Sequence, residues 1–357
     1  MLAVVALGAA WFVTGGIPAH DVASALSGAR AVLGGQAAEV PAPTADVVAL
    51  ADAAHLSEEG RRLFYATRPQ ILDAAAFAGR CGDVEVSPET EAGGFVGCYR
   101  PGADTILVYR PADPRLAGQA VVTAAHETLH AAWTRLTPAD RDELTPILDA
   151  AASAIPADDD IHTEIAGSVG THPENRPTEL FAYLGTQVDG LDPRLEQVYA
   201  RYFTDRAALV AVHTGLRALV DGMATDITTA SQALVATESA NAQARAQLTA
   251  DEASRDSYRQ MYQAKVDDVA AMSADQRSRL RLSWVWWDGT ELPMARADTT
   301  LAAAAALLAR DDAALPARDA TIAAAEASAA AERTRLDGLV ADFDALQAQM
   351  DPTPPAG

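Results

Sequence analysis

The sequence predicts a mainly helical chain with two parts: an α+β domain with a small β-hairpin or sheet, and a long C-terminal coiled-coil hairpin of α-helices. Alanine makes up roughly a fifth of the 357 residues and aromatic residues only 6%, which favours helix over sheet. Two short runs of β-type residues lie at 94–99 and 105–109. Apolar residues at heptad spacing, typical of coiled coils, begin at Leu209.

The chain is strongly acidic. It carries 27 Lys and Arg against 49 Asp and Glu, a formal net charge of −22. Nucleic-acid binding needs clustered positive charge to neutralise phosphates, so the composition argues against a nucleic-acid partner. With 49% hydrophobic residues, the chain is also too apolar for a disordered protein.

The N-terminal segment 1–19 is apolar, and residues 1–17 contain no charged side chain. This length approaches that of a membrane-spanning helix, so we expect a transmembrane anchor or an uncleaved signal segment. A cleaved signal peptide and a buried helix are the alternatives. Residues 20–55 are rich in Ala, Gly and Pro and predict a linker. We therefore expect the rest of the chain to lie outside the cytoplasm, membrane-anchored or secreted.

The α+β domain is expected to span residues 56–207 and to begin with two helices and the hairpin. Ser57 precedes two glutamates, as a helix N-cap does. A second helix is expected over 69–79, with Pro in its first turn. The runs at 94–99 and 105–109 flank Pro-Gly-Ala-Asp and predict a β-hairpin. This hairpin would supply an edge strand that binds extended peptide by strand addition.

The two cysteines, Cys81 and Cys98, are 17 positions apart. Two cysteines are too few for a cysteine-based zinc cluster. In an exported chain they are expected to form a disulfide that joins the end of the second helix to the first strand of the hairpin. Two unpaired thiols are the alternative.

The rest of the α+β domain is expected to be helical. Apolar residues repeat on one face over 119–136. A second helix is expected over 140–155, followed by a polar, irregular segment over 156–176 and a helix that opens at Pro177. The last helix carries a set of apolar and aromatic residues, Leu195, Tyr199, Tyr202 and Phe203.

Residues 208–350 predict two long helices that pair antiparallel. Near both ends of this region apolar residues alternate steps of three and four, as in a coiled coil: Leu209, Val212, Leu216, Leu219 and Met223, then Leu336, Leu339, Phe343, Leu346 and Met350. Such a seam pairs helices within one chain or between copies, so self-association is also possible.

A tryptophan-rich segment at 283–289 lies between these helices and is expected near their turn. Buried packing, a membrane-interface belt and a partner-binding patch are its three possible roles. Residues 351–357 are rich in proline and predict a disordered tail.

The chemistry is carried by His126-Glu127-Thr128-Leu129-His130, an HExxH motif on the helix expected over 119–136. Residues four apart share a helix face, so both histidines can bind one zinc ion at about 2.0–2.1 Å. Glu127 lies beside them, where it can take a proton from zinc-activated water and deliver it to a leaving amine. A solvated helix face is the alternative interpretation.

A catalytic zinc site needs a third protein ligand and an open position. Glu179 is the strongest candidate, because it opens a helix whose apolar face would pack against the HExxH helix. The other candidates lie in the polar segment before it: His162, Glu164, His172 and Glu174.

With these residues the chain resembles the gluzincin type of zincin metallopeptidase over about residues 57–205. The stretches TAAHETLHAAW and RPTELFAYLGTQ are similar to those of small bacterial, membrane-anchored members. The resemblance implies His126, His130 and Glu179 as zinc ligands and Glu127 as general base. One position departs: thermolysin-like members have an aspartate four residues after the ligand glutamate, and this chain has Tyr183.

Stabilising the oxyanion of the transition state needs a hydrogen-bond donor. Tyr199 and Tyr202, which follow Glu179, are the candidates we select, ahead of Arg206 and His213. A role in the core or at its rim is the alternative for each.

The function expected from these residues is zinc-dependent hydrolysis of peptide bonds in a peptide or protein outside the cytoplasm. The alternative is a catalytically silent zincin-like scaffold that binds partners through its coiled-coil arm. A zinc hydrolase acting on cell-wall amides ranks lower, since the acidic chain offers no attraction to an anionic polymer.

Overall fold

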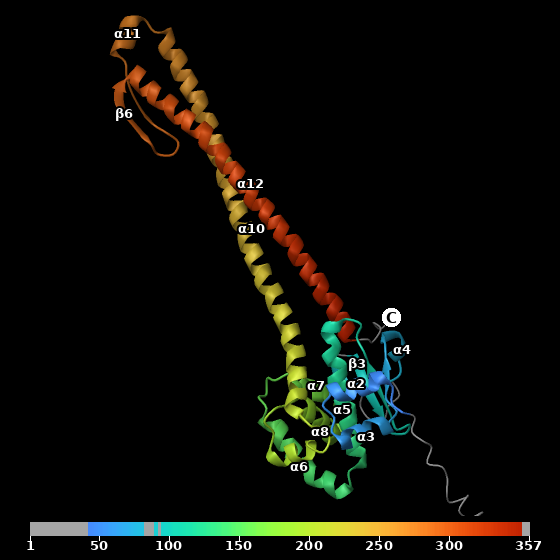
Figure 1. Ribbon diagram of the computed structural model, residues 1–357. Helices are drawn as coiled ribbons and strands as arrows, with labels where there is room; N and C mark the ends of the chain where they lie inside the picture. The colour runs from blue at the N-terminus through green and yellow to red at the C-terminus, as the bar shows by residue number, and fades with distance from the viewer. Residues whose placement is uncertain (1–41, 82–88, 92–93, 352–357) are drawn as a thin grey trace, which may run out of the picture. The chain divides into compact units, whose positions relative to one another are not determined.

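The computed structural model describes residues 42–81, 89–91 and 94–351 (Figure 1). The expected membrane segment 1–19, the linker residues 20–41 and the tail residues 352–357 lie outside this part of the chain. The described residues form two units. The first comprises 42–110 and 119–210, and the second comprises Pro111–Gly118 and Ala211–Asp351. The sequence predicted a single boundary after residue 207. It did not predict that Pro111–Gly118 belongs to the second unit.

The first unit contains a four-stranded sheet with the order β1-β4-β3-β2. The predicted hairpin is confirmed as β3 (Gly94–Arg100) and β4 (Thr105–Tyr109), which pair antiparallel. These strands are central, because β1 (Gln70–Leu72) pairs parallel with β4 and β2 (Glu89–Glu91) pairs antiparallel with β3. The expectation that the hairpin itself supplies the sheet edge is therefore wrong for the described strands.

Helices surround this sheet. The N-cap of α3 is Ser57, as predicted, and its side chain accepts a hydrogen bond from the N–H of Gly60 at 3.0 Å. The helices expected near 119–136 and 140–155 are also present. The helices of the first unit are α2 (Ala45–Ala53), α3 (Glu58–Ala66), α4 (Ala74–Phe77), α5 (Ala117–Arg135), α6 (Pro138–Ala154), α7 (Ile161–Val169), α8 (Arg176–Gln187) and α9 (Pro193–Tyr199).

Four local expectations differ from the structure. Residues 45–53, expected as linker, form α2, because Val47, Leu50 and Ala51 are buried in the core. Helix α7 lies in the expected irregular segment and buries Ile161 and Ile165. The helix expected over 69–79 is divided into β1 and α4, since Asp73 caps α4. The last helix of the domain, α9, ends at Tyr199, before Tyr202 and Phe203.

The two faces of the sheet belong to different cores. Tyr99, Ile106 and Val108 pack into the large core that contains α5 and α8. Cys98 and Leu107, which point to the opposite face, pack with the residues near α4. Because successive residues of a strand point to opposite faces, β3 connects the helical core to the smaller one.

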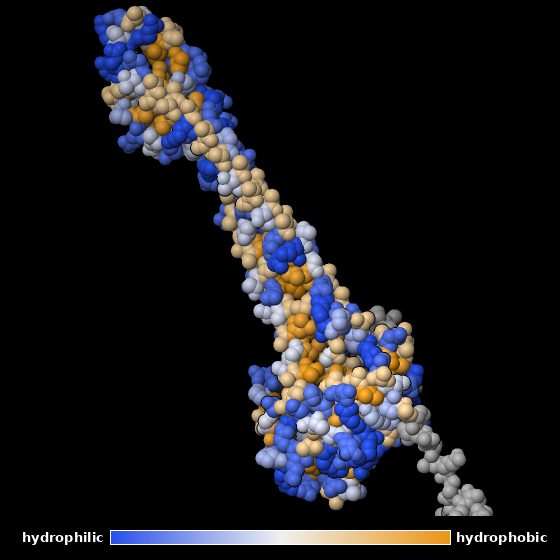
Figure 2. Space-filling view, in the orientation of Figure 1, coloured by the Kyte–Doolittle hydropathy of each residue, from blue (hydrophilic) through white to orange (hydrophobic). Residues whose placement is uncertain are grey.

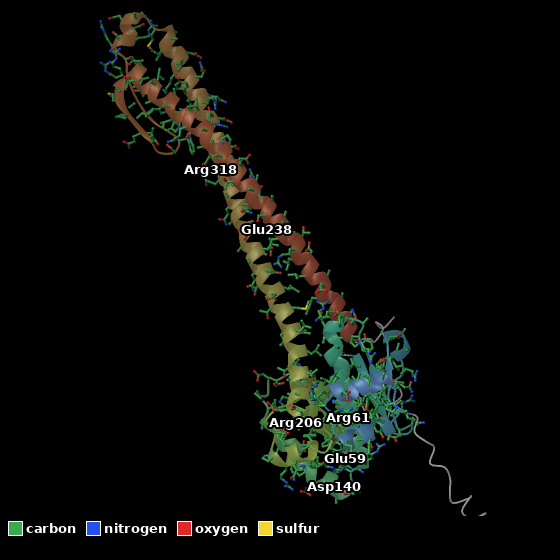
Figure 3. The ribbon with its side chains drawn as sticks, in the orientation of Figure 1. Glu59, Arg61, Asp140, Arg206, Glu238 and Arg318 are labelled. Carbon is green, nitrogen blue, oxygen red and sulfur yellow. A yellow bond between two sulfur atoms is a disulfide. The ribbon has the colours of Figure 1, made fainter. Side chains whose placement is uncertain are left out.

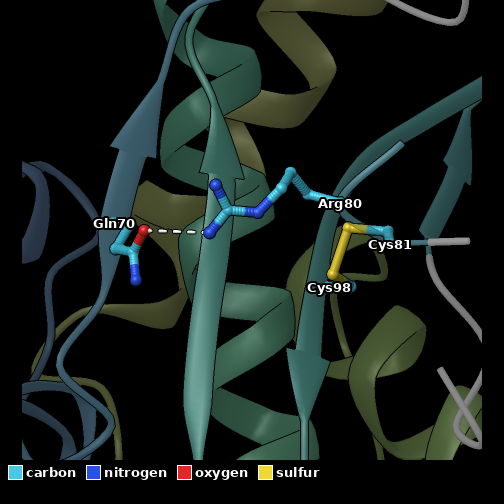
Figure 4. Close-up of a disulfide and its surroundings, with 4 residues drawn as sticks. All are labelled: Gln70, Arg80, Cys81 and Cys98. Atoms are coloured by element: carbon cyan, nitrogen blue, oxygen red, sulfur yellow. Dashed lines mark hydrogen bonds between the residues drawn. A yellow bond between two sulfur atoms is a disulfide. The ribbon is translucent and has the colours of Figure 1, made fainter. Parts of the chain in front are cut away.

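Cys81 and Cys98 form a disulfide, as predicted, with Cα atoms 6.0 Å apart (Figure 4). Both are buried, with 3% and 0% of their surfaces exposed. Beside them, Arg80 donates a hydrogen bond to Gln70 of β1 at 3.4 Å. The disulfide therefore ties β3 to the chain that follows α4.

The second unit is built on α10 (Arg206–Ala271), which begins in the first unit, and α12 (Ala297–Met350). Apolar pairs along them run in opposite directions: Leu216 clusters with Leu346, Leu234 with Leu336, and Leu248 with Leu315. Leu116 joins the first cluster, which places Pro111–Gly118 in this unit. The chain therefore has a small sheet and long C-terminal helices, as expected.

Ion pairs flank these apolar contacts. Arg318 of α12 pairs with Asp251 of α10 at 2.6 Å, and Arg333 pairs with Glu238 at 2.5 Å. Arg318 and Glu238 are labelled in Figure 3. An 18-residue window of α10 reaches a mean hydropathy of 1.2, enough by length and composition to cross a membrane. Helices that pack against other helices pass the same test, as α10 does along α12.

The tryptophan-rich segment forms a hairpin next to the end of α10, with α11 (Ala274–Arg279) before β5 (Arg281–Val285) and β6 (Glu291–Arg296). Trp286 is buried, and its indole N–H donates to Oδ2 of Asp311 at 2.8 Å. Trp287 donates to the same oxygen at 2.8 Å. Packing against α12 thus accounts for Trp286. Apolar side chains, among them the exposed Met294, also reach the surface at this end (Figure 2).

Candidate metal centre

Helix α5 carries the HExxH motif through the middle of the first unit. The spacing of four residues puts His126 and His130 on one face, one turn apart, and their rings are 4.7 Å apart between centroids. Residues on every side of this helix are buried from Val122 to Trp133. The small side chains of Ala124, Ala125 and neighbouring residues allow this close packing.

Glu179 joins the two histidines, as predicted. Its Oε2 lies 3.8 Å from Nε2 of His126 and 3.6 Å from Nε2 of His130, and the two Nε2 atoms are 3.0 Å apart. Ligands of a tetrahedral ion bound at about 2.0–2.1 Å lie about 3.3–3.4 Å from each other. The observed separations of 3.0–3.8 Å bracket this value, and the three residues could together hold one small metal ion.

Helix α8 brings Glu179 to this place. Leu180, Phe181 and Leu184 are buried in the same core as Leu129 of α5, so the apolar face of α8 fixes its position. Glu179 lies in the first turn of α8, where the positive end of the helix dipole favours a carboxylate.

The buried carboxyl groups of the site bear on whether it can hold a cation. Both oxygens of Glu179 are buried and have no hydrogen-bond partner within the described part of the chain. Burial, and then the nearby Glu127, raise the pKa of Glu179 well above its ordinary value. A divalent cation would balance the two carboxylates beside the neutral imidazoles, since buried charges are paired or bind metals. The residues present therefore fit a divalent metal ion.

Both histidines are in the form that binds metals. Burial lowers the pKa of His126 well below its ordinary value, and it lowers the pKa of His130 to about 3. At neutral pH the two rings are therefore uncharged, so each has one nitrogen lone pair for a metal.

Two neighbours that the sequence analysis did not identify hold these rings. Nδ1 of His130 lies 2.8 Å from Oγ1 of Thr178, the residue before Glu179. The ring of Tyr183 packs edge-on against His126, with centroids 4.7 Å apart, and its hydroxyl bonds to Oγ of Ser168 on α7 at 2.8 Å. Tyr183, at the position that departs from thermolysin-like sequences, thus packs against a predicted ligand.

Glu127 lies next to β3 as well as near Glu179. A Cβ added at Gly97 of β3 would lie 3.3 Å from Oε1 of Glu127 and 2.3 Å from Cγ2 of Thr123, so only glycine fits between strand and helix. Burial raises the pKa of Glu127 well above its ordinary value, and a backbone hydrogen bond from Tyr99 opposes this shift. In the sequence, the only sign of this contact is a glycine, Gly97, within a predicted strand, where a missing side chain can mark the close approach of another element.

The site is closed to solvent. Each of His126, Glu127, His130 and Glu179 has at most 1% of its surface exposed. A molecule as large as a peptide reaches these groups only after part of the surrounding structure has moved.

The two tyrosines predicted to stabilise the oxyanion make contacts within the core. Tyr199 is fully buried, and its hydroxyl donates to the carbonyl of Phe181 at 2.8 Å. Tyr202 follows α9, where its carbonyl accepts from the N–H of Ser57 at 2.8 Å and its ring contacts Phe181. Both tyrosines therefore contribute to packing around α8.

The two weaker candidates for this role also lie elsewhere. Arg206, labelled in Figure 3, pairs with Glu196 and donates to the carbonyls of Leu184 and Val188 at the end of α8. His213 belongs to the second unit.

The alternative third ligands lie outside the cluster as well. His162 and Glu164 are on α7, and His162 bonds to the carbonyl of Pro156 at 3.0 Å. His172 and Glu174 are exposed and pair with each other at 3.1 Å. Among the described residues, the group of converging ligands consists of His126, His130 and Glu179.

Comparisons of the chain with protein-family models, with curated proteins and with solved structures find no match. The interpretation of the site therefore depends on its own geometry.

Proposed function

We propose that the protein is a zinc-dependent metallopeptidase that hydrolyses peptide bonds outside the cytoplasm. The observation that carries this proposal is the convergence of His126, His130 and Glu179 within 4.8 Å of one another, next to a buried glutamate in the HExxH arrangement. Two imidazoles and one carboxylate are the protein ligands of many catalytic zinc sites.

In this proposal His126, His130 and Glu179 hold the ion. When bound, zinc supplies a Lewis acid that polarises a carbonyl and acidifies water. Glu127 would act as the general base, taking a proton from the attacking water and returning it to the departing amine.

The substrate class, peptide bonds, rests on the resemblance of the motif to gluzincin peptidases. On the same resemblance we propose a zincin-like fold for the first unit. The coiled-coil hairpin is likewise our interpretation of α10 and α12, supported by their apolar clusters. The buried disulfide Cys81–Cys98 supports an oxidising location, consistent with anchoring through residues 1–19.

Metal analysis tests the site itself. Protein purified from an oxidising compartment without chelators is expected to contain one zinc per chain, and Glu179→Gln is expected to lose most of it. Glu174→Gln is the matched control, because Glu174 is exposed and lies five residues before Glu179 in the sequence. Wild-type protein without any bound metal would overturn the proposal, as would equal zinc contents in the wild type and Glu179→Gln.

Turnover tests the function. Hydrolysis of a fluorogenic peptide library by wild-type protein is expected to fall by about 10²–10⁴-fold in Glu127→Gln, the usual contribution of a general base, with the zinc content unchanged. Zinc binding without wild-type turnover on peptides or unfolded proteins would favour the alternative, a silent scaffold that acts through its helical arm.

A further inference from the structure

Thr178 occupies a special place beside the proposed metal centre. It precedes Glu179 on α8, and its Oγ1 lies 2.8 Å from Nδ1 of His130. Thr178 and His130 are buried, with 7% and 1% of their surfaces exposed. Consecutive residues of a helix point about 100° apart, so α8 reaches the cluster with one side chain and the ring of His130 with the other.

The direction of this hydrogen bond follows from the proposed binding of the metal at Nε2 of His130. Nε2 of His130 faces Nε2 of His126 at 3.0 Å and Oε2 of Glu179 at 3.6 Å. A metal ligand must present a lone pair, so the single proton of the neutral ring belongs on Nδ1. Nδ1–H then donates to the Thr178 hydroxyl, which accepts.

We propose that Thr178 is a positioning residue that selects the Nδ1–H tautomer of His130 and fixes its ring for metal binding. This inference rests on the metal centre of the proposed function and not on its peptidase activity. A neutral hydroxyl suits the site, since Glu127 and Glu179 are already buried carboxylates and a carboxylate at position 178 would bring a third negative charge close to them.

Zinc affinity tests this role. Competition with a chromophoric chelator is expected to show a dissociation constant 10–100-fold higher for Thr178→Val, the usual effect of removing a partner of a ligating histidine. Thr178→Ser keeps the hydroxyl and is expected to restore most of the affinity. Thr186→Val is the control: Thr186 is also buried on α8, but its hydroxyl donates to the carbonyl of Ala182.

The tautomer gives a readout that packing alone would not move. In metal-free protein with ¹⁵N-labelled histidine, the wild type is expected to show a protonated Nδ1 on His130, and Thr178→Val a mixture of tautomers. Unchanged zinc affinity in Thr178→Val would overturn the inference. So would a proton on Nε2 of His130 in the wild-type protein, a measurement that does not depend on whether a variant folds. Zinc binding without peptidase activity would overturn the proposed enzyme and leave this inference standing.

Discussion

Nε2 of His126 and Nε2 of His130 lie 3.0 Å apart, a close approach that is compatible with the uncharged state in which burial leaves both rings at neutral pH. Two residues one helical turn apart readily point the same way. Oε2 of Glu179 lies 3.6–3.8 Å from both nitrogens and supplies the third candidate ligand.

Zinc affinity is expected to increase with pH. Burial raises the pKa of Glu127 and Glu179 well above their ordinary values, so the metal-free site keeps carboxyl protons that the ion must displace. The lowered pKa of both histidines means that protons compete little for the rings. Calorimetric zinc titrations in two buffers of different ionisation enthalpy measure the protons released. Binding without proton release, at constant affinity, contradicts the prediction.

Gly97→Ala is expected to lower the free energy of unfolding by about 1–3 kcal/mol, the range for overpacking a core. The new Cβ would lie 2.3 Å from Cγ2 of Thr123 and 3.1 Å from the carbonyl of Leu107. Denaturant unfolding measures the loss. Adding Thr123→Ser removes the closer obstacle and is expected to recover part of the stability. A Gly97→Ala protein as stable as the wild type means that β3 does not approach α5 this closely.

Loss of the disulfide is expected to destabilise the first unit and leave the metal ligands in place. Replacing Cys81 and Cys98 with alanine removes a cross-link between residues 17 apart, a loss of about 3 kcal/mol in the chain-entropy model. Zinc content is expected to persist, because the ligands lie on α5 and α8 and not on the sheet. Unfolding with and without reductant checks this: the reductant should destabilise only the wild type.

Asp311→Ala is expected to loosen the β5–β6 hairpin. Oδ2 of Asp311 accepts the indole N–H groups of Trp286 and Trp287, both at 2.8 Å. Its loss leaves a buried donor unsatisfied at a cost of about 1–3 kcal/mol, so tryptophan fluorescence should shift to the red. The neighbouring Asp312→Ala removes an exposed acid that pairs with Arg259 and should leave the spectrum unchanged. Identical spectra for both variants would contradict the assigned contact.

Local patterns in the sequence were enough to predict much of the fold and of the candidate site. The HExxH spacing predicts a shared helix face because it depends only on helical geometry, and Ser57 and the β3–β4 hairpin depend on equally local rules. The apolar face of α8 was enough to select Glu179. Helices α2 and α7 were missed because short segments become helical through burial of a few side chains, such as Leu50 and Ile165, which local composition does not reveal.

The sequence by itself determined which residues of this protein share a helix face, which cysteines are near enough to join, and where apolar seams repeat. Only the tertiary structure decided that Thr178 holds His130, that Gly97 brings β3 against Glu127, and that the hydroxyl of Tyr199 is used by the carbonyl of Phe181. The reason is physical. Periodicity within one element follows from backbone geometry, whereas a contact between elements depends on how all of their apolar faces pack at once.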